Sequence, residues 1–321
     1  MSHPIENLPR HEFDMVPQEI TDVFNDILRF RVDPSSSYFK EVNLDKIVER
    51  IKQLNTGKVA AIASEGKEAK YQEKGHMYDP VLQAFVQGCG GRLSTWTIEE
   101  HTTTPIVLRG ITKRREMAAC KEAGRDFYYI DTGYFGNGKK KLYHRVTKND
   151  VQYFGPIIDR PADRFEKTGV RVSKFRPGSK ILLAPPSQKL LNLYGIDLAQ
   201  WLVETQEEIR KYSDRPIVIR EKQSRTVRQS SDTMEMALSQ DIHCLVTFSS
   251  IAAGEALLCG KPAITLGPNA AAPLCSKRLK EIENPKIPTV DEVRAWAAHL
   301  AYCQFTEAEM KDGTAWRILN E

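Results

Sequence analysis

The sequence predicts an α/β protein of two domains, each built on a β-sheet that helices cover. Three observations predict this class. A chain of 321 residues with 41% apolar side chains is long enough to bury two separate cores. In the C-terminal half, short apolar strands alternate with amphipathic helices, which is the pattern of a parallel sheet. Residues 175–180 carry the proline and glycine that are typical of an interdomain linker.

In the N-terminal half, apolar residues recur at helical spacing over 20–30 and 44–54, which predicts two peripheral helices. Strand and helix patterns then alternate. We expect strands over 58–64, 92–98, 105–111 and 125–133, and helices over 78–88 and 113–124.

The C-terminal half alternates more regularly. We expect strands over 180–186, 216–221, 243–248 and 262–267, helices over 197–213, 230–240 and 251–260, and two further helices in the tail, 290–319. With the boundary at the linker, the predicted domains are residues 1–176 and 177–321. The expected architecture is two Rossmann-like domains with an interdomain cleft and C-terminal helices.

The sequence also indicates the cellular location of the protein and the state of its cysteines. The N-terminus lacks a basic start followed by an apolar stretch, and no run approaches the roughly 20 apolar residues of a membrane span. We therefore expect a cytoplasmic protein, in the host cytoplasm if the chain is viral. Six scattered cysteines form no C-x-x-C pair, so we expect buried reduced thiols and no metal site.

The positive charge is uneven along the chain. Between Lys139 and Lys180, twelve Lys or Arg stand against four Asp or Glu, although the whole chain carries only +4. Such an excess suits an anionic polymer such as double-stranded DNA. A solvated surface loop is an equally good interpretation, and the count does not decide between them.

The most informative segment is 243–267. A buried strand ends there, Ser249 and Ser250 stand at the expected cap of the next helix, and Gly260 and Pro262 end that helix. Free backbone N–H groups at such a helix start suit a phosphate. Glu255, an acid within this apolar helix, could accept hydrogen bonds from a ribose. The alternatives are a plain N-cap and a solvent-facing acid.

Two other loops are expected at the same edge of the sheet. Ser187 follows the first strand of the C-terminal half, and Arg220, Lys222 and Arg225 follow the second. These bases could neutralise a nucleoside diphosphate. Because ligands bind beyond the carboxyl ends of parallel strands, we predict a phosphate-binding cluster here. Ordinary exposed loop bases are the alternative.

Asp131 is the leading candidate for a catalytic base. It stands at the end of the predicted strand 125–133, before an aromatic turn. Glu65, His76 and Asp79 are rivals in loops of the same half, and for each a turn or helix-capping role is the alternative.

Two nucleotide-binding motifs are absent. The glycines and lysines from Gly133 to Lys140 resemble a P-loop in spacing, but no Ser or Thr follows the lysine and a strand-like segment comes next. No G-x-G-x-x-G follows a strand. These absences disfavour kinases, ATPases and dehydrogenases.

The run SSIAAGEALLCGKPAI, residues 249–264, resembles the donor-binding signature of GT-B glycosyltransferases and their epimerase relatives. In that family serine and glycine cap a helix beneath the diphosphate, and the glutamate holds the ribose. More loosely, YYIDTGYFG and YHRVTKND resemble GT-B-like proteins of tailed bacteriophages. Some relatives of those proteins glycosylate hydroxymethylated bases in phage DNA.

The resemblance implies a GT-B-like glycosyltransferase with the donor in the C-terminal domain and the acceptor in the N-terminal domain. The donor would be a nucleotide-sugar, with a UDP-sugar expected first, and no other cofactor. An Asp-x-Asp pair is absent, which favours a metal-independent enzyme. A modified base in phage DNA is the expected acceptor, flipped from the stack. The expected acceptor-binding residues are Lys113, Arg114, Arg115, Tyr134, Lys139, Lys140 and Arg145.

Two alternatives stay open. A polysaccharide glycosyltransferase or a sugar-nucleotide epimerase would keep the fold and need no basic groove. A non-catalytic nucleic-acid-binding protein would bind DNA without binding a nucleotide-sugar, although the pairing of Ser250 with Glu255 disfavours it. Salt-sensitive DNA binding separates these possibilities.

Overall fold

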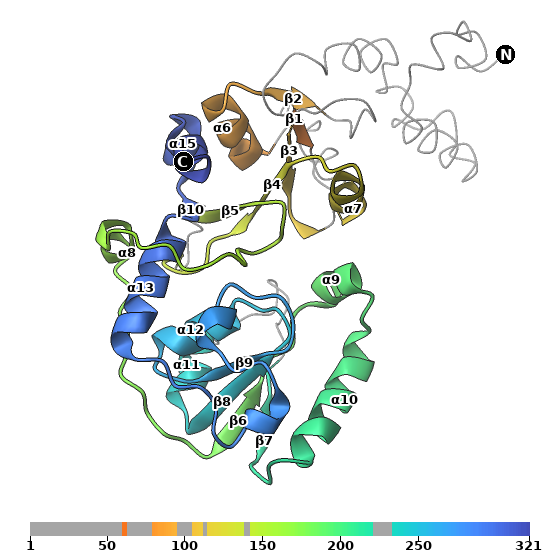
Figure 1. Cartoon of the computed structure of the whole chain (residues 1–321), viewed down its shortest axis with the longest axis vertical. Coiled ribbons are helices and arrows are strands. Elements are labelled where there is room, and N and C mark those ends of the chain that lie inside the picture. Colours follow the sequence, from red (N-terminus) through yellow and green to blue (C-terminus); the bar gives the residue numbers. More distant parts are fainter. Residues whose placement is uncertain (1–59, 63–78, 95–104, 112–113, 138–141, 221–232) are drawn as a thin grey trace, which may run out of the picture.

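The computed structural model describes residues 60–62, 79–94, 105–111, 114–137, 142–220 and 233–321. These residues form two lobes, each with its own sheet (Figure 1). The predicted helices over 20–30 and 44–54 lie outside the described residues. So do most of the first predicted strand and the second half of the strand predicted over 92–98.

The first sheet has six strands in the order β10-β5-β4-β3-β1-β2. The four strands β2, β1, β3 and β4 are parallel, β5 pairs antiparallel with β4, and β10 pairs antiparallel with β5 at that side of the sheet. The strands are β1 (Ala60–Ile62), β2 (Arg92–Ser94), β3 (Ile106–Arg109), β4 (Phe127–Thr132), β5 (His144–Lys148) and β10 (Gln304–Phe305). The first sheet is therefore mixed rather than purely parallel.

Helices α6 (Pro80–Gly88) and α7 (Arg114–Glu122) belong to the first sheet. Apolar residues of α6 pack in one core with Tyr128 and Ile130 of β4, and Met117 of α7 packs in another core with Phe127 and Tyr129. Since alternate residues of a strand point to opposite faces, the two helices cover opposite faces of the sheet.

The second sheet is parallel throughout, in the order β7-β6-β8-β9. Its strands are β6 (Lys180–Leu183), β7 (Ile217–Ile219), β8 (Ile242–Thr247) and β9 (Ala263–Thr265). Helix α10 (Leu198–Arg210) covers one face, and α11 (Met234–Ser239) and α12 (Ala252–Leu258) cover the other. The alternation of strands and helices predicted for this half is confirmed.

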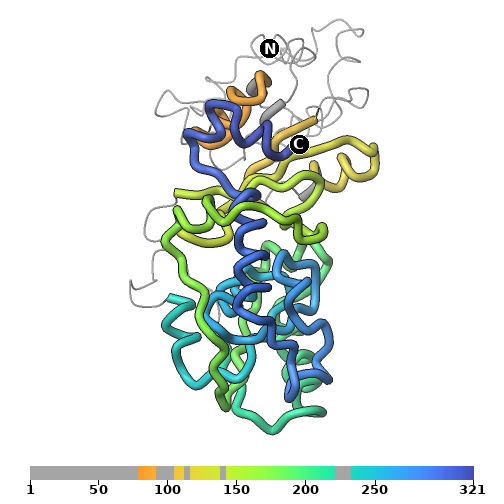
Figure 2. The backbone as a smooth tube through the Cα atoms, turned by 60° about the vertical axis from the view of Figure 1, so that its left-hand side comes forward, coloured from red at the N-terminus to blue at the C-terminus, as the bar shows by residue number. Residues whose placement is uncertain are grey.

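The tail differs from the prediction of two helices. It forms α13 (Val290–Ala301), the short strand β10, α14 (Glu307–Lys311) and α15 (Thr314–Leu319). Strand β10 pairs with β5 of the first sheet, and α14 and α15 pack on α6. Figure 2 shows this chain returning from the second lobe to the first. A strand of two residues has no periodicity, so the sequence pattern could not indicate it.

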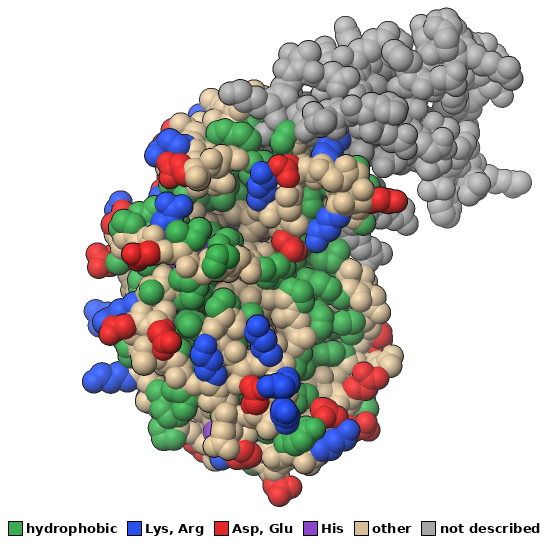
Figure 3. Space-filling model, viewed as in Figure 1, with side chains coloured by type: hydrophobic (Ala, Val, Ile, Leu, Met, Phe, Trp, Pro, Cys, Tyr) green, Lys and Arg blue, Asp and Glu red, His purple; other side chains and the backbone are tan. Residues whose placement is uncertain are grey.

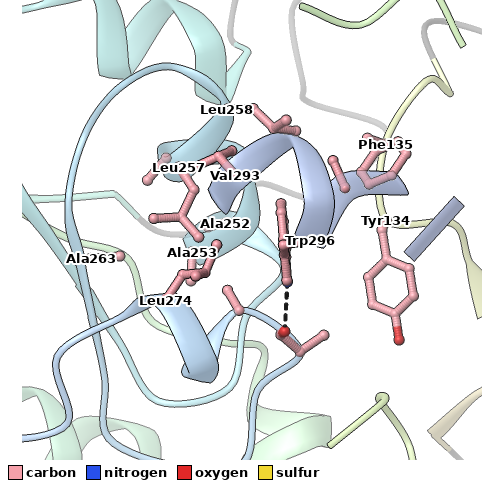
Figure 4. Close-up of a cluster of buried hydrophobic side chains, with 14 of the residues drawn as sticks. Tyr134, Phe135, Ala252, Ala253, Leu257, Leu258, Ala263, Leu274, Val293 and Trp296 are labelled. Carbon is pink, nitrogen blue, oxygen red and sulfur yellow. Dashed lines mark hydrogen bonds between the residues drawn. The ribbon is translucent and has the colours of Figure 1, made fainter. Parts of the chain in front are cut away.

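A shared core joins the two lobes (Figure 4). Trp296 of α13 is buried, and its indole N–H donates to the Ala270 carbonyl over 2.8 Å. Tyr134 and Phe135, which follow β4, pack in the same core as residues of α12. Gly254 of α12 faces Trp296 so closely that a Cβ there would lie 2.9 Å from the indole ring.

The predicted linker packs against the second lobe. The Ser173 N–H donates to the Leu258 carbonyl and the Arg176 N–H donates to the Gly260 carbonyl. Gly260 adopts a φ of 69°, a left-handed conformation that suits glycine and ends α12 as predicted. The linker is thus fixed along the end of α12.

Candidate functional site

The carboxyl ends of the second sheet bring several predicted residues to one edge. In the register of the sheet, Leu183 of β6 lies opposite Ile219 of β7 and Val246 of β8. Ser187, Arg220 and Ser250 each follow one of these three strands within a few residues. The convergence expected from the sequence is therefore present, and this carboxyl edge is the candidate site.

Ser250 lies two residues before α12, whose N-cap is Ile251, so it does not occupy the predicted cap position. Its hydroxyl accepts a hydrogen bond from the Ala252 N–H over 3.2 Å, and its carbonyl accepts one from the Asn269 side chain. Ser250 is half-buried. Asn269 follows β9, so loops from two adjacent strands fix the position of this serine.

Ser249 has a different role from the predicted phosphate contact. It is fully buried, and its hydroxyl donates to the Pro268 carbonyl. The Gln152 side-chain amide donates to the Ser249 carbonyl over 2.6 Å, and its oxygen accepts from the Ala270 N–H. Gln152 belongs to the chain that follows β5, so Ser249 ties the two lobes together. We leave it out of the donor site.

Glu255 lies in the first turn of α12, because the helix begins at Ala252 rather than earlier. It is half-buried. The charge of Glu255 affects the pKa of the Cys259 thiol, which follows one helical turn later. Burial, followed by the charges of Glu235 and Glu255, raises the pKa of Cys259 to about 11.

Ser187 is exposed just before the short helix α9 (Gln188–Leu191), and its carbonyl accepts from the Leu190 N–H. Arg220 continues the pairing of β7 with β6, since its N–H donates to the Leu183 carbonyl over 2.9 Å. Its guanidinium contacts the Met234 sulfur. Lys222 and Arg225 lie outside the described residues.

Asp131 lies on the face of the first sheet that turns toward this edge. It shares that face of β4 with Tyr129, which packs in the α7 core. Leu190 and Leu193, from the chain after β6, pack against the same core. The face that carries Asp131 is thus the one that meets the loops of the second sheet.

Three donors hold the Asp131 side chain. The Tyr129 hydroxyl donates to it over 2.9 Å, the Thr132 N–H over 2.7 Å and the Arg145 guanidinium over 3.1 Å. Burial and the Asp131 charge raise the pKa of Tyr129, so this hydroxyl stays protonated and donates. Such donors stabilise the charged carboxylate. Its side chain remains 39% exposed, so a ligand can still reach it.

Arg145 and Tyr134 were predicted to bind the acceptor, and both are buried instead. The Arg145 guanidinium also donates to the Thr132 and Val151 carbonyls. Tyr134 is 6% exposed and its hydroxyl accepts from the Tyr153 N–H, so it has no open face for a base to stack on. Both side chains consolidate the turn after β4.

The other acceptor predictions are not described by the structure. Lys113, Lys139 and Lys140 lie outside the described residues. Arg114 and Arg115 begin α7, and their side chains lie outside the described part of the structure. Their proposed role in acceptor binding stays a prediction.

Four of the nine described bases in the stretch from 139 to 180 pair with acids from elsewhere in the chain. Besides the pair of Arg145 with Asp131, three pairs are Lys148–Asp126 at 2.7 Å, Arg164–Glu309 at 2.6 Å and Arg160–Glu321 at 3.8 Å. On the face in Figure 3, acidic and basic side chains lie interspersed. Part of the positive charge counted along the sequence is therefore neutralised by ion pairs.

Asp79, a rival for the catalytic base, is a helix cap. It is 3% exposed, accepts from the Val81 N–H at the start of α6 and pairs with Arg109 of β3. The capping alternative is confirmed for this residue. Glu65 and His76 lie outside the described residues.

Sequence reasoning missed Gln152 and Gln304, two buried amides that fix the site. Gln304 of β10 accepts from the Tyr134 N–H over 2.7 Å, and Gln152 joins Ser249 to the first lobe. Single glutamines carry no spacing signal, so only the fold reveals them.

Among the described residues, no group of three or more His, Cys, Asp or Glu side chains could hold a metal ion. Within those same ranges, every helix is too short or too polar to cross a membrane. Of the six cysteines, five are buried as expected and Cys259 is half-exposed.

Comparison with known proteins gives structural neighbours only. The chain matches no protein-family model, and a search of curated proteins finds no match. Among solved structures it is similar to the beta Kdo 2,4 transferase of Thermosulfurimonas dismutans KpsC, with 14% identity and a TM-score of 0.40 over 76% of this chain and 91% of that chain.

The beta Kdo 2,7 transferase of the same protein is also similar, with 12% identity and a TM-score of 0.44 over 74% of this chain and 89% of that chain. Both neighbours are transferases by description. Because both TM-scores lie below 0.5, we base the function on this chain's own residues.

Proposed function

We propose that the protein is a glycosyltransferase that binds a nucleotide-sugar at the carboxyl edge of the second sheet. The observation that carries the proposal is the meeting of two features. Three parallel strands deliver Ser187, Arg220 and Ser250 to one edge, and the face of the first sheet that bears Asp131 turns toward that edge. Ligands of parallel α/β sheets bind at such edges.

Each residue has a specific task in this proposal. Arg220 neutralises the phosphate of the leaving nucleotide, Ser187 and Ser250 donate hydroxyl hydrogen bonds to it, and Glu255 accepts from the ribose. Because Arg220 supplies positive charge, the proposed reaction needs no metal ion. We place UDP-sugars first among the donors to test.

Asp131 faces the acceptor in this scheme. Since three donors stabilise its carboxylate, we assign it to accept a hydrogen bond from the incoming hydroxyl and to orient that hydroxyl for attack. The proposed arrangement is of the GT-B kind, with donor and acceptor held by different lobes.

A saccharide hydroxyl is the acceptor that we favour over a modified DNA base. A saccharide acceptor needs no basic groove, and four of the nine described bases of the stretch from 139 to 180 pair with acids. Buried Tyr134 also offers no stacking surface for a flipped base.

A thermal-shift screen tests the donor site. The purified protein is melted with UDP, GDP, CDP, ADP and their sugars, and the screen is repeated with Glu255→Ala. A nucleotide at a hundred times its Kd adds about 2.7 kcal/mol to the free energy of unfolding. We expect one nucleotide family to stabilise the protein and Glu255→Ala to remove the effect.

The matched control is Glu207→Ala, which removes an exposed acid from α10 on the opposite face of the second sheet. It should leave the shift unchanged. If no nucleotide or nucleotide-sugar stabilises the native protein, the proposal is wrong.

A further inference from the structure

A hollow lies beside the candidate site, on the face of the second sheet that α11 and α12 cover. Its volume is about 420 Å³, within the range of small-molecule sites. Leu182 of β6 and Val218 of β7 form its floor, side by side in the register of the sheet. Met236 and Ala237 of α11 form the opposite wall. The result is a slot between a strand pair and a helix.

The apolar walls of this slot are unusually open to solvent. Val218 is 41% exposed and Met236 is 53% exposed. Large apolar side chains that gather around one concave site mark a place where a ligand or partner binds. A methionine sulfur also makes favourable contacts with aromatic rings. The walls therefore suit a flat, apolar or aromatic group.

The charged side chains that line the slot are basic. Lys180 and Arg220 line it, and no acid is among the lining residues that the structure describes. Lys180 begins β6 and Arg220 follows β7, so along the strands they are about 13 Å apart. Arg220 stands at the carboxyl edge and thus belongs to both the slot and the candidate phosphate site.

Two uncharged polar side chains complete the lining. The Thr233 hydroxyl accepts from the Met236 N–H, which leaves its own proton available to a ligand. Gln240, at the end of α11, is exposed and offers both a donor and an acceptor. An aromatic ring in the slot could therefore find hydrogen-bond partners at its edge.

We propose that this slot binds the nucleobase of the donor, with the attached phosphate at Arg220. The inference rests on the proposed function and adds where the nucleotide lies: across the β6–β7 face rather than only at the strand ends. Val218, Met236 and the edge groups Thr233 and Gln240 are then base-binding residues.

Filling the slot tests this placement. Val218→Trp puts a large side chain into it from an edge strand, where aromatic residues are well tolerated. Binding of UDP, GDP, CDP and ADP is measured by calorimetry beside inorganic pyrophosphate, which has no base. We expect the best-bound nucleotide to lose at least tenfold in affinity and pyrophosphate to keep its affinity within twofold.

A milder variant and a control accompany it. Met236→Ala removes an exposed wall of the slot and should weaken the nucleotide a few-fold without loss of folding. Val203→Trp adds the same side chain at a 54% exposed position on α10, on the other face of the sheet, and should change nothing.

The outcomes separate the two proposals. Nucleotide binding that is equally strong in native protein, Val218→Trp and Met236→Ala overturns the slot and leaves the donor site standing. Equal losses for nucleotide and pyrophosphate also overturn it, because the base would then not be the group displaced. If no nucleotide binds the native protein, both proposals fail.

Discussion

Arg220 is the residue on which the proposed phosphate contact most depends, because it directly follows β7 at the carboxyl edge. Arg220→Ala should weaken the preferred nucleotide at least tenfold, and Arg220→Lys should restore part of that loss, since lysine keeps the charge but not the planar fork. Calorimetric titration measures both. Arg210→Ala, at the end of α10, is the control. If Arg220→Ala binds the nucleotide as tightly as the native protein does, Arg220 is not part of the site.

His299 of α13 gives the fold a dependence on pH. It is 3% exposed, and burial, followed by the Arg160 charge, lowers its pKa to about 4. An unfolded histidine has a pKa of about 6.5. Between these values the unfolded chain binds a proton that the folded chain does not. Stability is therefore complete above pH 6.5 and falls as pH drops toward 4.

The size of this effect is measurable. Between pH 7 and pH 5 the free energy of unfolding should fall by about 2 kcal/mol through His299 alone. Urea unfolding of the native protein and of His299→Gln at both pH values isolates the contribution. An identical fall in the variant would show that other groups cause the acid sensitivity.

At the scale of elements, the packing of α12 on α13 depends on a glycine. Gly254→Ala would place a Cβ 2.9 Å from the Trp296 ring, so the two helices must move apart. Such overpacking costs about 1 to 3 kcal/mol. A double-mutant cycle with Trp296→Phe, followed by urea unfolding, should reveal coupling between the two positions. Additive losses would contradict the contact.

The start of α6 depends on Asp79. Asp79→Ala removes an N-cap and leaves Arg109 without the acid that pairs with it here, at a cost of about 2 to 4 kcal/mol. Asp79→Asn keeps the cap and loses only the charge, so it should cost less. Urea unfolding that ranks the two variants in the opposite order would contradict this assignment.

Most elements could be predicted from periodicity, because each presents an apolar face of helical or strand spacing. The second sheet shows this best. Strand β10 and the burial of Arg145 and Tyr134 could not be predicted. The burial of Arg145 and Tyr134 depends on partners such as Asp131 and Tyr153. Contacts of this kind leave no periodic pattern in the sequence.

For the molecule as a whole, Gln152 is the polar tie between the lobes. Gln152→Ala leaves the buried Ala270 N–H without its acceptor and should cost about 1 to 3 kcal/mol. Exposed Gln200 on α10 provides the matched control, Gln200→Ala. A melting curve that is unchanged by Gln152→Ala would contradict a tie that stabilises the fold.

Charge pairing sets the expectation for DNA. Because acids from other segments balance Arg145, Lys148, Arg160 and Arg164, we expect weak binding to a DNA duplex without a steep dependence on salt. Fluorescence anisotropy at 50 and 200 mM salt measures this. Tight binding that falls a thousandfold over that range would restore DNA as the acceptor.

Release of free nucleotide from nucleotide-sugars, with saccharide acceptors present, tests the central claim most directly. We predict release from one class of donor, increased by a suitable acceptor and reduced at least a hundredfold by Arg220→Ala or Asp131→Asn. A glycosyltransferase with its donor at the carboxyl edge of the second sheet would be contradicted by two results. One is no release from any donor, and the other is release by both variants at the rate of the native protein.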